Sequence, residues 1–309
     1  MADVVVSEFM VDSARESLAR DFEVVYDPAL AGDRKALLAS VTAARALVVR
    51  NRTIVDAALL AAAPSLKVVG RLGVGLDNID LDACDIAGVE VCPATGANAD
   101  AVAEYVLATT LMLVRGAFSS TNRVAEGSWP RAELVGREVA GRKAGLLGFG
   151  DVARRVAGLL GAVGMEVAGH DPYLDRGDTA WGRVQPMGLT DLLAISEVLS
   201  IHVPLTDETR HLVDADAMAA MPAGAVLVNT SRGGVVDEVA LVEALRSGHL
   251  GGAAVDVFAD EPLDAVAGET FHDVPNLVLT PHVAGITVES EERVGRVVAG
   301  QVRRVLGAC

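Results

Sequence analysis

The chain has 309 residues, of which 51% are hydrophobic, 4% aromatic and 22% charged. This composition excludes a disordered chain and favours two domains whose cores are built from Ala, Val, Leu and Gly. The formal net charge of −16 excludes the overall basic character that nucleic-acid binding requires.

Five short Val-rich runs in the first part of the chain predict buried strands. They are ADVVVSE, FEVVYD, RALVVR, LKVVGR and VEVCP, all between Ala2 and Pro93. Stretches rich in Ala and Leu with helical spacing separate most of them. Buried strands that alternate with helices are typical of a parallel α/β domain.

A long helical run, NADAVAEYVLATTLMLVR, extends from Asn98 to about Arg115, with Asn98 as its predicted N-cap. The stretch after it, GSWPRAELVGREVAG, is irregular and carries Trp129. A second α/β series then starts at KAGLLGFG and continues through MEVAGHD, VLSIHVP, AVLVNTS, GGAAVDVF and NLVLTP. The last helix is predicted from about Thr287 to Leu306.

A glycine pattern opens the second series. Gly148, Gly150 and Ala153 form G-x-G-x-x-A between a strand-like run and a helix-like run. The first glycine permits a tight turn, the second lets the backbone approach a pyrophosphate, and the helix N-terminus then binds the phosphates. Asp171 ends the next strand, where a carboxylate binds ribose hydroxyls and repels a 2′-phosphate. The pattern predicts NAD rather than NADP; the alternative is an ordinary strand–helix turn with a surface aspartate.

A complete α/β unit precedes this glycine pattern, so the cofactor domain is predicted to be inserted into the first domain. The predicted fold class is α/β, with two Rossmann-like parallel-sheet domains. Residues 1–97 and 284–309 are expected to form a discontinuous, flavodoxin-like substrate-binding domain. Residues 98–283 are expected to form the NAD-binding domain.

Arg232, Glu261 and His282 each follow a predicted strand of the second series. Open α/β sheets bind ligands beyond the carboxyl ends of their strands. A guanidinium holds a carboxylate at two points, a histidine transfers protons near neutral pH, and a carboxylate orients the imidazole. Taken singly, each residue has a plainer explanation: a strand-end ion pair, a solvated loop acid or a structural histidine. Together they predict one reaction site.

Seven motifs in chain order cover nearly the whole sequence: GRLGVGLDNID, ATGANADAVAE, GFGDVARRVA, HVPLT, NTSRGGVVDE, AVDVFADEPL and LTPHVAG. In these motifs the chain resembles the D-isomer-specific 2-hydroxyacid dehydrogenase family, and within it the phosphoglycerate dehydrogenase-like members. The resemblance implies an NAD-dependent enzyme that interconverts a D-2-hydroxy acid and its 2-oxo acid. It implies that Arg232 holds the substrate carboxylate, Glu261 pairs with the imidazole and His282 is the acid/base. Formate-oxidising relatives lack the acidic partner of the histidine, so Glu261 favours a hydroxy acid.

The resemblance also implies contacts beyond these three residues. Cofactor contacts are expected from Gly148, Gly150, Asp151, Val152, Asp171, Val203, Pro204, Thr230, Ser231, Arg232, Asp256, His282 and Gly285. The amides around Val74 and Gly75 are expected to form a second grip on the substrate carboxylate. Ala153 departs from the commoner glycine, but a small residue is sufficient at that position.

Basic side chains predict a second anion on the substrate. Arg50 and Arg52 follow the third strand, and Arg131 resembles a position at which phosphoglycerate enzymes reach into a neighbouring subunit's site. We expect Arg52 to bind this distal anion; the alternative is that these are ordinary surface arginines. A 3-phosphoglycerate-like acid is the first expectation, and 3-sulfolactate dehydrogenase and glyoxylate or hydroxypyruvate reductase are the alternatives.

Location and partners follow from the remaining features. Cys84, Cys92 and Cys309 have neither metal-ligand spacing nor an even disulfide set, which indicates free thiols and no metal site. Asp3 and Glu8 stand where a signal peptide would be positive, and no apolar run approaches the ~20 residues of a membrane span. We expect a cytoplasmic enzyme with no nucleic-acid or membrane partner. The NADAVAEYVL helix and the GSWPRAEL segment resemble the family's dimer interface, so a homodimer is expected. An NAD-sensing transcriptional corepressor is the alternative of another class.

Overall fold

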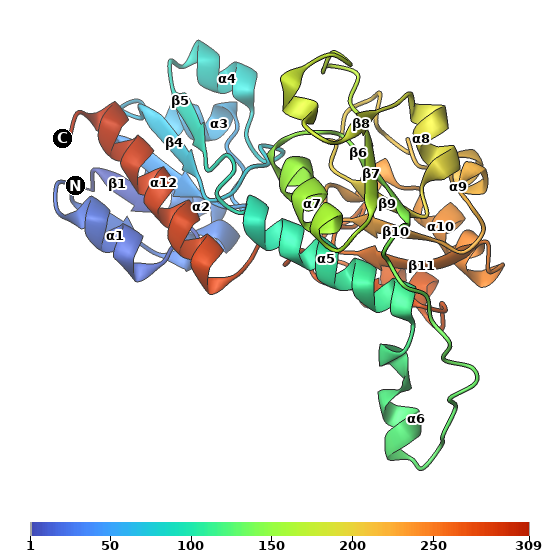
Figure 1. Cartoon of the computed structure of the whole chain (residues 1–309). Coiled ribbons are helices and arrows are strands. Elements are labelled where there is room, and N and C mark those ends of the chain that lie inside the picture. Colours follow the sequence, from blue (N-terminus) through green and yellow to red (C-terminus); the bar gives the residue numbers. More distant parts are fainter. Residues whose placement is uncertain (1, 309) are drawn as a thin grey trace. The chain divides into compact units, whose positions relative to one another are not determined.

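The computed structural model describes residues 2–308, and the chain divides into two compact units. One unit combines the chain up to Asn98 with the chain from Ile286, and the other runs from Ala99 to Gly285 (Figure 1). Cys84 and Cys92 are buried free thiols. Cys309, the third predicted thiol, lies outside the described residues.

The first unit is built on a five-stranded parallel sheet. Its strands are β1 (Val4–Val6), β2 (Val24–Tyr26), β3 (Ala46–Val49), β4 (Val68–Arg71) and β5 (Glu90–Pro93). Its helices are α1 (Asp12–Ala19), η1 (Pro28–Gly32), α2 (Arg34–Ser40), α3 (Ala57–Ala62), α4 (Leu81–Ile86) and α12 (Val288–Leu306). The strand order β2-β1-β3-β4-β5 is the flavodoxin-like order, as predicted.

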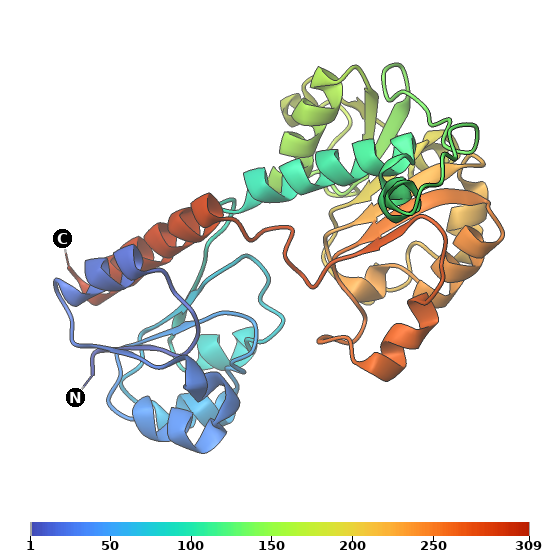
Figure 2. The same ribbon diagram turned by 90° about the horizontal axis from the view of Figure 1, so that it is seen from below.

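Helices cover both faces of this sheet, which is why its strands are apolar on both sides. Helices α1 and α12 lie side by side on one face, and α2, α3 and α4 pack on the other (Figures 1 and 2). Gly70 on β4 permits the close approach of α12, because a Cβ there would lie 2.6 Å from Cγ1 of Val298. The last helix thus completes the core of the unit that the N-terminal segment begins.

The second unit is built on a seven-stranded parallel sheet. Its strands are β6 (Lys143–Leu147), β7 (Glu166–His170), β8 (Gln185–Pro186), β9 (Val198–Ile201), β10 (Ala225–Asn229), β11 (Leu250–Val255) and β12 (Leu277–Leu279). Its α-helices are α5 (Ala99–Arg115), α6 (Thr121–Ala125), α7 (Asp151–Ala162), α8 (Leu189–Ile195), α9 (Ala215–Ala220), α10 (Glu238–Arg246) and α11 (Ala265–Gly268). Its short 3-10 helices are η2 (Phe118–Ser120), η3 (Thr179–Trp181), η4 (Gly233–Val235) and η5 (Glu269–Phe271).

The order of the second sheet, β12-β11-β10-β9-β6-β7-β8, is Rossmann-like, with its reversal between β9 and β6. Helices α5 and α7 cover one face, and α8, α9 and α10 cover the other. The predicted α/β class with two Rossmann-like parallel sheets is therefore confirmed. The short edge strand β8 was not predicted.

The helix ends follow their sequence signals in one case and depart from them in another. Helix α12 begins with a capping box, in which the Thr287 hydroxyl accepts from Ser290 N–H and the Ser290 hydroxyl accepts from Thr287 N–H. The predicted cap of α5 is wrong. The side-chain oxygen of Asn98 is buried and accepts no hydrogen bond from any described residue, so it does not cap the helix.

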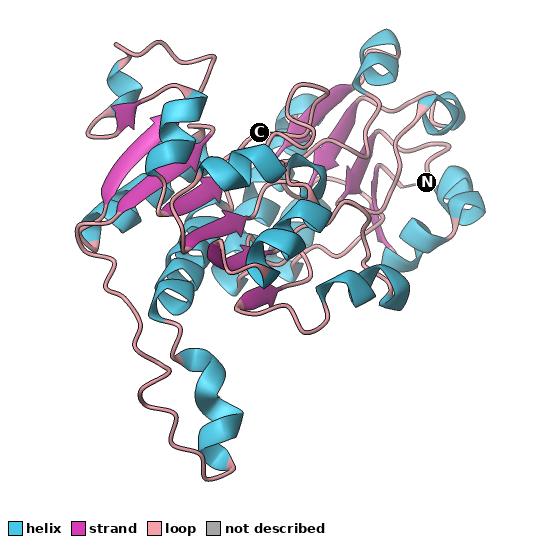
Figure 3. Ribbon diagram, turned by 90° about the vertical axis from the view of Figure 1, so that its right-hand side faces the viewer, coloured by secondary structure: helices cyan, strands magenta, loops and turns pink. Residues whose placement is uncertain are grey.

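A projecting segment leaves the second unit after α5. Residues 116–140, which we call the arm, contain η2, α6 and the irregular stretch predicted from the sequence (Figures 1 and 3). Within residues 2–308, no single helix is long and apolar enough to span a membrane, and only the bent pair of Ala99–Arg115 with Phe118–Ala125 meets the criterion jointly.

Candidate active site

The loops of the second unit meet at one edge of its sheet because all seven strands run parallel. Main-chain hydrogen bonds join these loops: His202 N–H donates to Leu147 O at 2.7 Å, and Asp256 N–H donates to Asn229 O at 3.0 Å. The three predicted catalytic side chains follow β10, β11 and β12. They therefore share an edge with the glycine loop that follows β6.

The central contact of the site joins His282 to Glu261. Nδ1 of His282 lies 2.7 Å from Oε2 of Glu261, and Oε1 of Glu261 accepts a hydrogen bond from Phe258 N–H at 3.0 Å. Burial raises the pKa of Glu261, but the bonds from His282 and Phe258, with the charges of His282 and Arg232, outweigh it, so the pKa lies below its ordinary value. Glu261 is thus held ionised beside the ring. The two side chains remain 41% and 30% exposed, so a ligand can reach them.

A strained turn presents His282. Its φ is 56°, a left-handed conformation that non-glycine residues adopt rarely and chiefly where their surroundings impose it. Here Asp256 imposes it: its carbonyl accepts from His282 N–H, and its carboxylate accepts from Val283 N–H and Ala284 N–H, all at 2.8 Å. The same carboxylate accepts from the Thr280 hydroxyl at 2.5 Å.

The direct contacts of Asp256 are therefore with the turn that carries His282. The residue is 1% exposed, and both of its carboxylate oxygens accept hydrogen bonds from the segment that carries His282. A buried carboxylate with several N–H donors is fixed in place and fixes those donors in turn. The structure therefore gives Asp256 a positioning role, while its contact with the cofactor stays a prediction.

Asn229 organises the arginine loop. Its side-chain oxygen accepts from Ser231 N–H at 3.1 Å, and its amide donates to Arg232 O at 2.9 Å. The Arg232 guanidinium donates to Ser231 O at 2.6 Å, and its charge lowers the pKa of Glu261. Asn229 was not predicted as a site residue. An asparagine at a strand end before Thr-Ser is the turn signal that marks it.

Two contacts tie the arginine loop to the loop that carries Glu261. A Cβ on Gly233 would lie 1.9 Å from the carbonyl carbon of Phe258, so only glycine fits there. Glu238, on the helix after Gly233, accepts from Ala259 N–H at 2.7 Å, and burial raises its pKa above the ordinary value. Arg232 and Glu261 are therefore positioned by one packed assembly.

The glycine loop has the form that a dinucleotide requires. Gly148 adopts a φ of 88°, and a Cβ there would lie 2.9 Å from the main chain of His202, so glycine is needed. Space beside Gly150 is open: apart from its two chain neighbours, no described residue comes within 4 Å of a Cβ built there, and no described side chain caps α7 at this residue. The first-turn N–H groups of α7, at Asp151 and Val152, are thereby left for a phosphate.

Other predicted cofactor residues surround this loop. Asp171 accepts from Phe149 N–H at 2.9 Å and from Tyr173 N–H at 3.0 Å, one bond on each carboxylate oxygen, which leaves acceptor capacity for ribose hydroxyls. The Thr230 hydroxyl is buried and has no partner among the described residues. An orphaned hydroxyl and an uncapped helix end both fit a bound nucleotide. The remaining predicted contacts follow strand ends or the histidine turn: Val203, Pro204, Ser231 and Gly285.

The predicted substrate residues of the first unit lie in loops after β3 and β4. Val74 is exposed, and Gly75 is partly exposed beside it. Arg50 makes two hydrogen bonds to the Glu291 carboxylate, at 2.8 and 2.6 Å. Arg52 is exposed, and no hydrogen bond or ion pair joins its guanidinium to any described residue. Of the two strand-end arginines, Arg52 is therefore the one available to a ligand.

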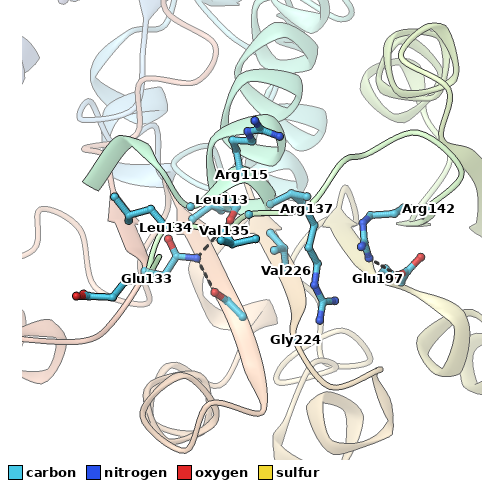
Figure 4. A pocket seen from close by; sticks show the side chains of 15 residues that line it. Leu113, Arg115, Glu133, Leu134, Val135, Arg137, Arg142, Glu197, Gly224 and Val226 are labelled. Atoms are coloured by element: carbon cyan, nitrogen blue, oxygen red, sulfur yellow. Dashed lines mark hydrogen bonds and ion pairs between the residues drawn. The ribbon is translucent and has the colours of Figure 1, made fainter. Parts of the chain in front are cut away.

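A separate cavity of about 280 Å³ belongs to the second unit (Figure 4). Its lining comes from the end of α5, the base of the arm and the beginnings of β10 and β11, including Arg115, Arg137, Val226 and Gly251. The catalytic candidates follow the opposite ends of those strands. None of the predicted site residues belongs to this lining, so the cavity is not the candidate active site.

Comparisons with known proteins indicate the same kind of enzyme as the geometry of the site does. The family model for "D-isomer specific 2-hydroxyacid dehydrogenase, NAD binding domain" matches residues 107–284. The chain is 50% identical over 308 residues to (S)-sulfolactate dehydrogenase of Chromohalobacter salexigens, covering 99% of each chain. It is 41% identical over 274 residues to D-3-phosphoglycerate dehydrogenase of Mycobacterium leprae, covering 89% of this chain but 51% of that protein. The chain therefore spans about half the length of that relative.

The fold also matches a solved structure with both ligand types bound. D-lactate dehydrogenase from Aquifex aeolicus, complexed with NAD and lactic acid, superposes with a TM-score of 0.84 and 29% identity. The match covers 98% of this chain and 95% of that chain.

Proposed function

Since the chain belongs to the D-isomer-specific 2-hydroxyacid dehydrogenase family and is an NAD-dependent oxidoreductase of 2-hydroxy acids, we propose that it oxidises (S)-3-sulfolactate or a closely similar acid. The main observation in support of the proposed catalytic roles is the 2.7 Å contact between Nδ1 of His282 and Oε2 of Glu261. The S descriptor agrees with a D-isomer enzyme. In sulfolactate the sulfur-bearing carbon outranks the carboxyl, so the spatial arrangement of D-lactate takes the label S.

The charges around Arg52 support a sulfonate over a phosphate. A phosphate monoester carries close to two negative charges at pH 7, whereas a sulfonate carries one. Arg50 is neutralised by Glu291, and the neighbouring acid Glu8 is buried against the same loop. Arg52 therefore supplies one uncommitted positive charge, which matches one negative charge. The phosphoglycerate relative keeps 3-phosphoglycerate as the second candidate.

The catalytic step requires one atom that accepts the proton of the substrate hydroxyl. Because Nδ1 of His282 is engaged by Glu261, Nε2 is left to face the substrate hydroxyl and accept its proton during oxidation. The ionised Glu261 stabilises the imidazolium that forms and fixes the ring. Arg232 is proposed to hold the substrate carboxylate at two points, and substrate contact by the amides at Val74 and Gly75 stays a prediction.

A bound NAD would supply the hydride acceptor for C2 of the substrate. Its pyrophosphate is assigned to the loop from Gly148 to Val152, and its adenosine ribose to Asp171. Val203, Pro204, Thr230, Ser231, Asp256 and Gly285 are proposed to contact the remainder. We propose that residues 98–283 bind NAD and that residues 1–97 and 284–309 bind the substrate, because the chain divides into two compact units close to these bounds.

A cytoplasmic homodimer is proposed as the working state. Apolar side chains on the arm support this assembly, because Phe118, Trp129 and Val135 are 63%, 80% and 82% exposed in the single chain. Exposed apolar surface of this kind typically marks a contact with another protein. Arg131, on the same arm, is a candidate for reaching the partner's site.

The test is a screen of NAD reduction with purified protein and four acids: (S)-3-sulfolactate, D-3-phosphoglycerate, D-glycerate and D-lactate. We expect the highest kcat/KM with sulfolactate. A higher value with phosphoglycerate would mean that the substrate carries a phosphate rather than a sulfonate. A higher value with D-lactate would mean that the substrate has no second anion. Absence of turnover with every acid would contradict the enzymatic function and favour a corepressor.

A further inference from the structure

Glu8 is a buried acid without a basic partner. It follows β1 and is 5% exposed. No arginine or lysine within residues 2–308 forms an ion pair with it. A carboxylate removed from water requires hydrogen bonds to replace its hydration. The position of its partners therefore shows what this acid organises.

All of its partners belong to the loop after β3. Oε1 of Glu8 accepts from Arg50 N–H at 2.8 Å and from Thr53 N–H at 3.0 Å, while Oε2 accepts from Arg52 N–H at 3.2 Å. The Asn78 amide holds the same loop from the other side, donating to Arg50 O at 3.2 Å and to Thr53 O at 2.6 Å. The backbone of residues 50–53 is thus fixed by two buried side chains.

The two arginines of this fixed loop have different surroundings. The Arg50 side chain is 21% exposed and pairs with Glu291 on α12. Arg52 is exposed and its guanidinium has no partner among the described residues. A rigid backbone that carries a free cation lowers the entropy that a ligand contact must overcome.

We propose that Glu8 is a positioning residue that orients Arg52 for the distal anion of the substrate, and so determines specificity for doubly anionic 2-hydroxy acids. This inference rests on the proposed function, since it requires Arg52 to bind that anion. Glu8 does not touch the substrate. It acts through the Arg52 amide, which Oε2 holds directly.

The geometry provides a selective variant. In Glu8→Gln the amide oxygen can replace Oε1 and keep the bonds to Arg50 and Thr53, but the NH₂ group then faces Arg52 N–H and cannot accept from it. The substitution therefore disturbs the residue that carries the free guanidinium. Thr53→Val is the matched control, because it removes the 2.9 Å hydroxyl contact with Ser7 and leaves all three amide bonds to Glu8 in place.

The experiment measures kcat and KM with (S)-3-sulfolactate and with D-lactate, which shares the reacting end but lacks the second anion. Arg52→Ala should lower kcat/KM for sulfolactate by roughly 10–200-fold, the loss of charge-assisted bonds, and leave D-lactate close to the wild-type value. Glu8→Gln should raise KM for sulfolactate by about 3–10-fold with kcat retained, again sparing D-lactate. The double variant should be no worse than Arg52→Ala alone, and Thr53→Val should affect both acids equally.

Several results would overturn the inference. Equal losses on both acids in Glu8→Gln would make Glu8 a structural residue only, as would a loss that adds in full to that of Arg52→Ala. If Glu8→Gln does not fold, Glu8→Asp, which keeps the charge and shortens the reach, must show the same selective loss. An Arg52→Ala variant with unchanged sulfolactate kinetics would overturn this inference while the proposed function survives. No turnover of either acid by the wild type would overturn both.

Discussion

Nδ1 of His282 lies 2.7 Å from Oε2 of Glu261, although 21 positions separate the two residues in the chain. The contact exists because β11 and β12 are parallel neighbours, so the loops that follow them meet at one edge. Asp256 fixes the histidine side of this contact, and the Phe258 N–H fixes the glutamate side. The arrangement leaves Nε2 as the ring atom that we propose to exchange a proton with substrate.

Glu261→Gln should change the pH profile of oxidation as well as its rate. The lowered pKa of Glu261 keeps the carboxylate ionised until the pH falls below its ordinary range, so its charge is present throughout the working range. As the pH falls through that lowered pKa the wild type loses this charge, whereas Glu261→Gln has no carboxylate to protonate, so the acid limb of kcat should differ between the two enzymes. The plateau should fall by about 10–100-fold, because the ring loses its orienting partner. Steady-state rates across pH, with NAD saturating, measure both effects, and an unmoved limb would remove Glu261 from the proton transfer.

Arg232→Lys should be almost as damaging as Arg232→Ala. The planar guanidinium grips a carboxylate at two points, which a lysine ammonium cannot reproduce. Both variants should lower kcat/KM by about 10²–10⁴-fold, the range for two charge-assisted hydrogen bonds. The measurement is kcat/KM of both variants with the acid that gives the highest kcat/KM in the screen. A lysine variant close to wild type would mean that only the positive charge matters.

Asp171→Ala should weaken the discrimination against NADP. Its carboxylate is proposed to bind the ribose hydroxyls and to repel a 2′-phosphate. The ratio of kcat/KM for NAD over NADP should fall by about 10–100-fold. Asp171→Asn is the control for loop geometry, since it removes the charge and keeps an acceptor for Phe149 N–H or Tyr173 N–H. Equal use of both cofactors by the wild type would show the assignment to be wrong.

Asp256→Asn should reduce turnover more than cofactor affinity. An asparagine places an NH₂ group opposite Val283 N–H or Ala284 N–H, so the histidine turn loses part of its support. We expect kcat to fall by about 10–100-fold, the range for partners that orient a reacting group. Titration of NADH fluorescence gives the affinity of the same variant. A loss of NADH affinity as large as the loss of kcat would make cofactor contact the main role of Asp256.

Most of the fold was predictable because its signals are local. Every Val-rich run that was quoted forms a strand, since short runs of mostly apolar residues bounded by polar ones leave a clear pattern. Strand β8 was missed because Gln185 and Pro186 carry no such pattern. The Asn98 cap was predicted wrongly because a cap residue and a buried side chain are indistinguishable in one sequence.

The site was predictable in part for the same reason. That His282, Glu261 and Arg232 lie at one edge of the sheet was predictable because each follows a strand, and parallel strands bring their ends together. The hydrogen bonds that hold this region in place were not predictable. The bonds that Asp256 accepts from the histidine turn, and that Glu291 accepts from Arg50 across 241 positions, depend on how distant segments pack. Glu8 entered the sequence analysis only as evidence against a signal peptide.

The central claim is that His282 transfers the proton in NAD-dependent oxidation of a 2-hydroxy acid, and His282→Asn tests it most directly. The measurement is kcat with the best acid of the screen, together with NADH affinity by fluorescence titration. We predict that turnover falls by ~10²–10⁴-fold, the usual cost of removing one general acid/base, while NADH still binds with nearly wild-type affinity. A variant that binds NADH and retains near-normal turnover would contradict the mechanism.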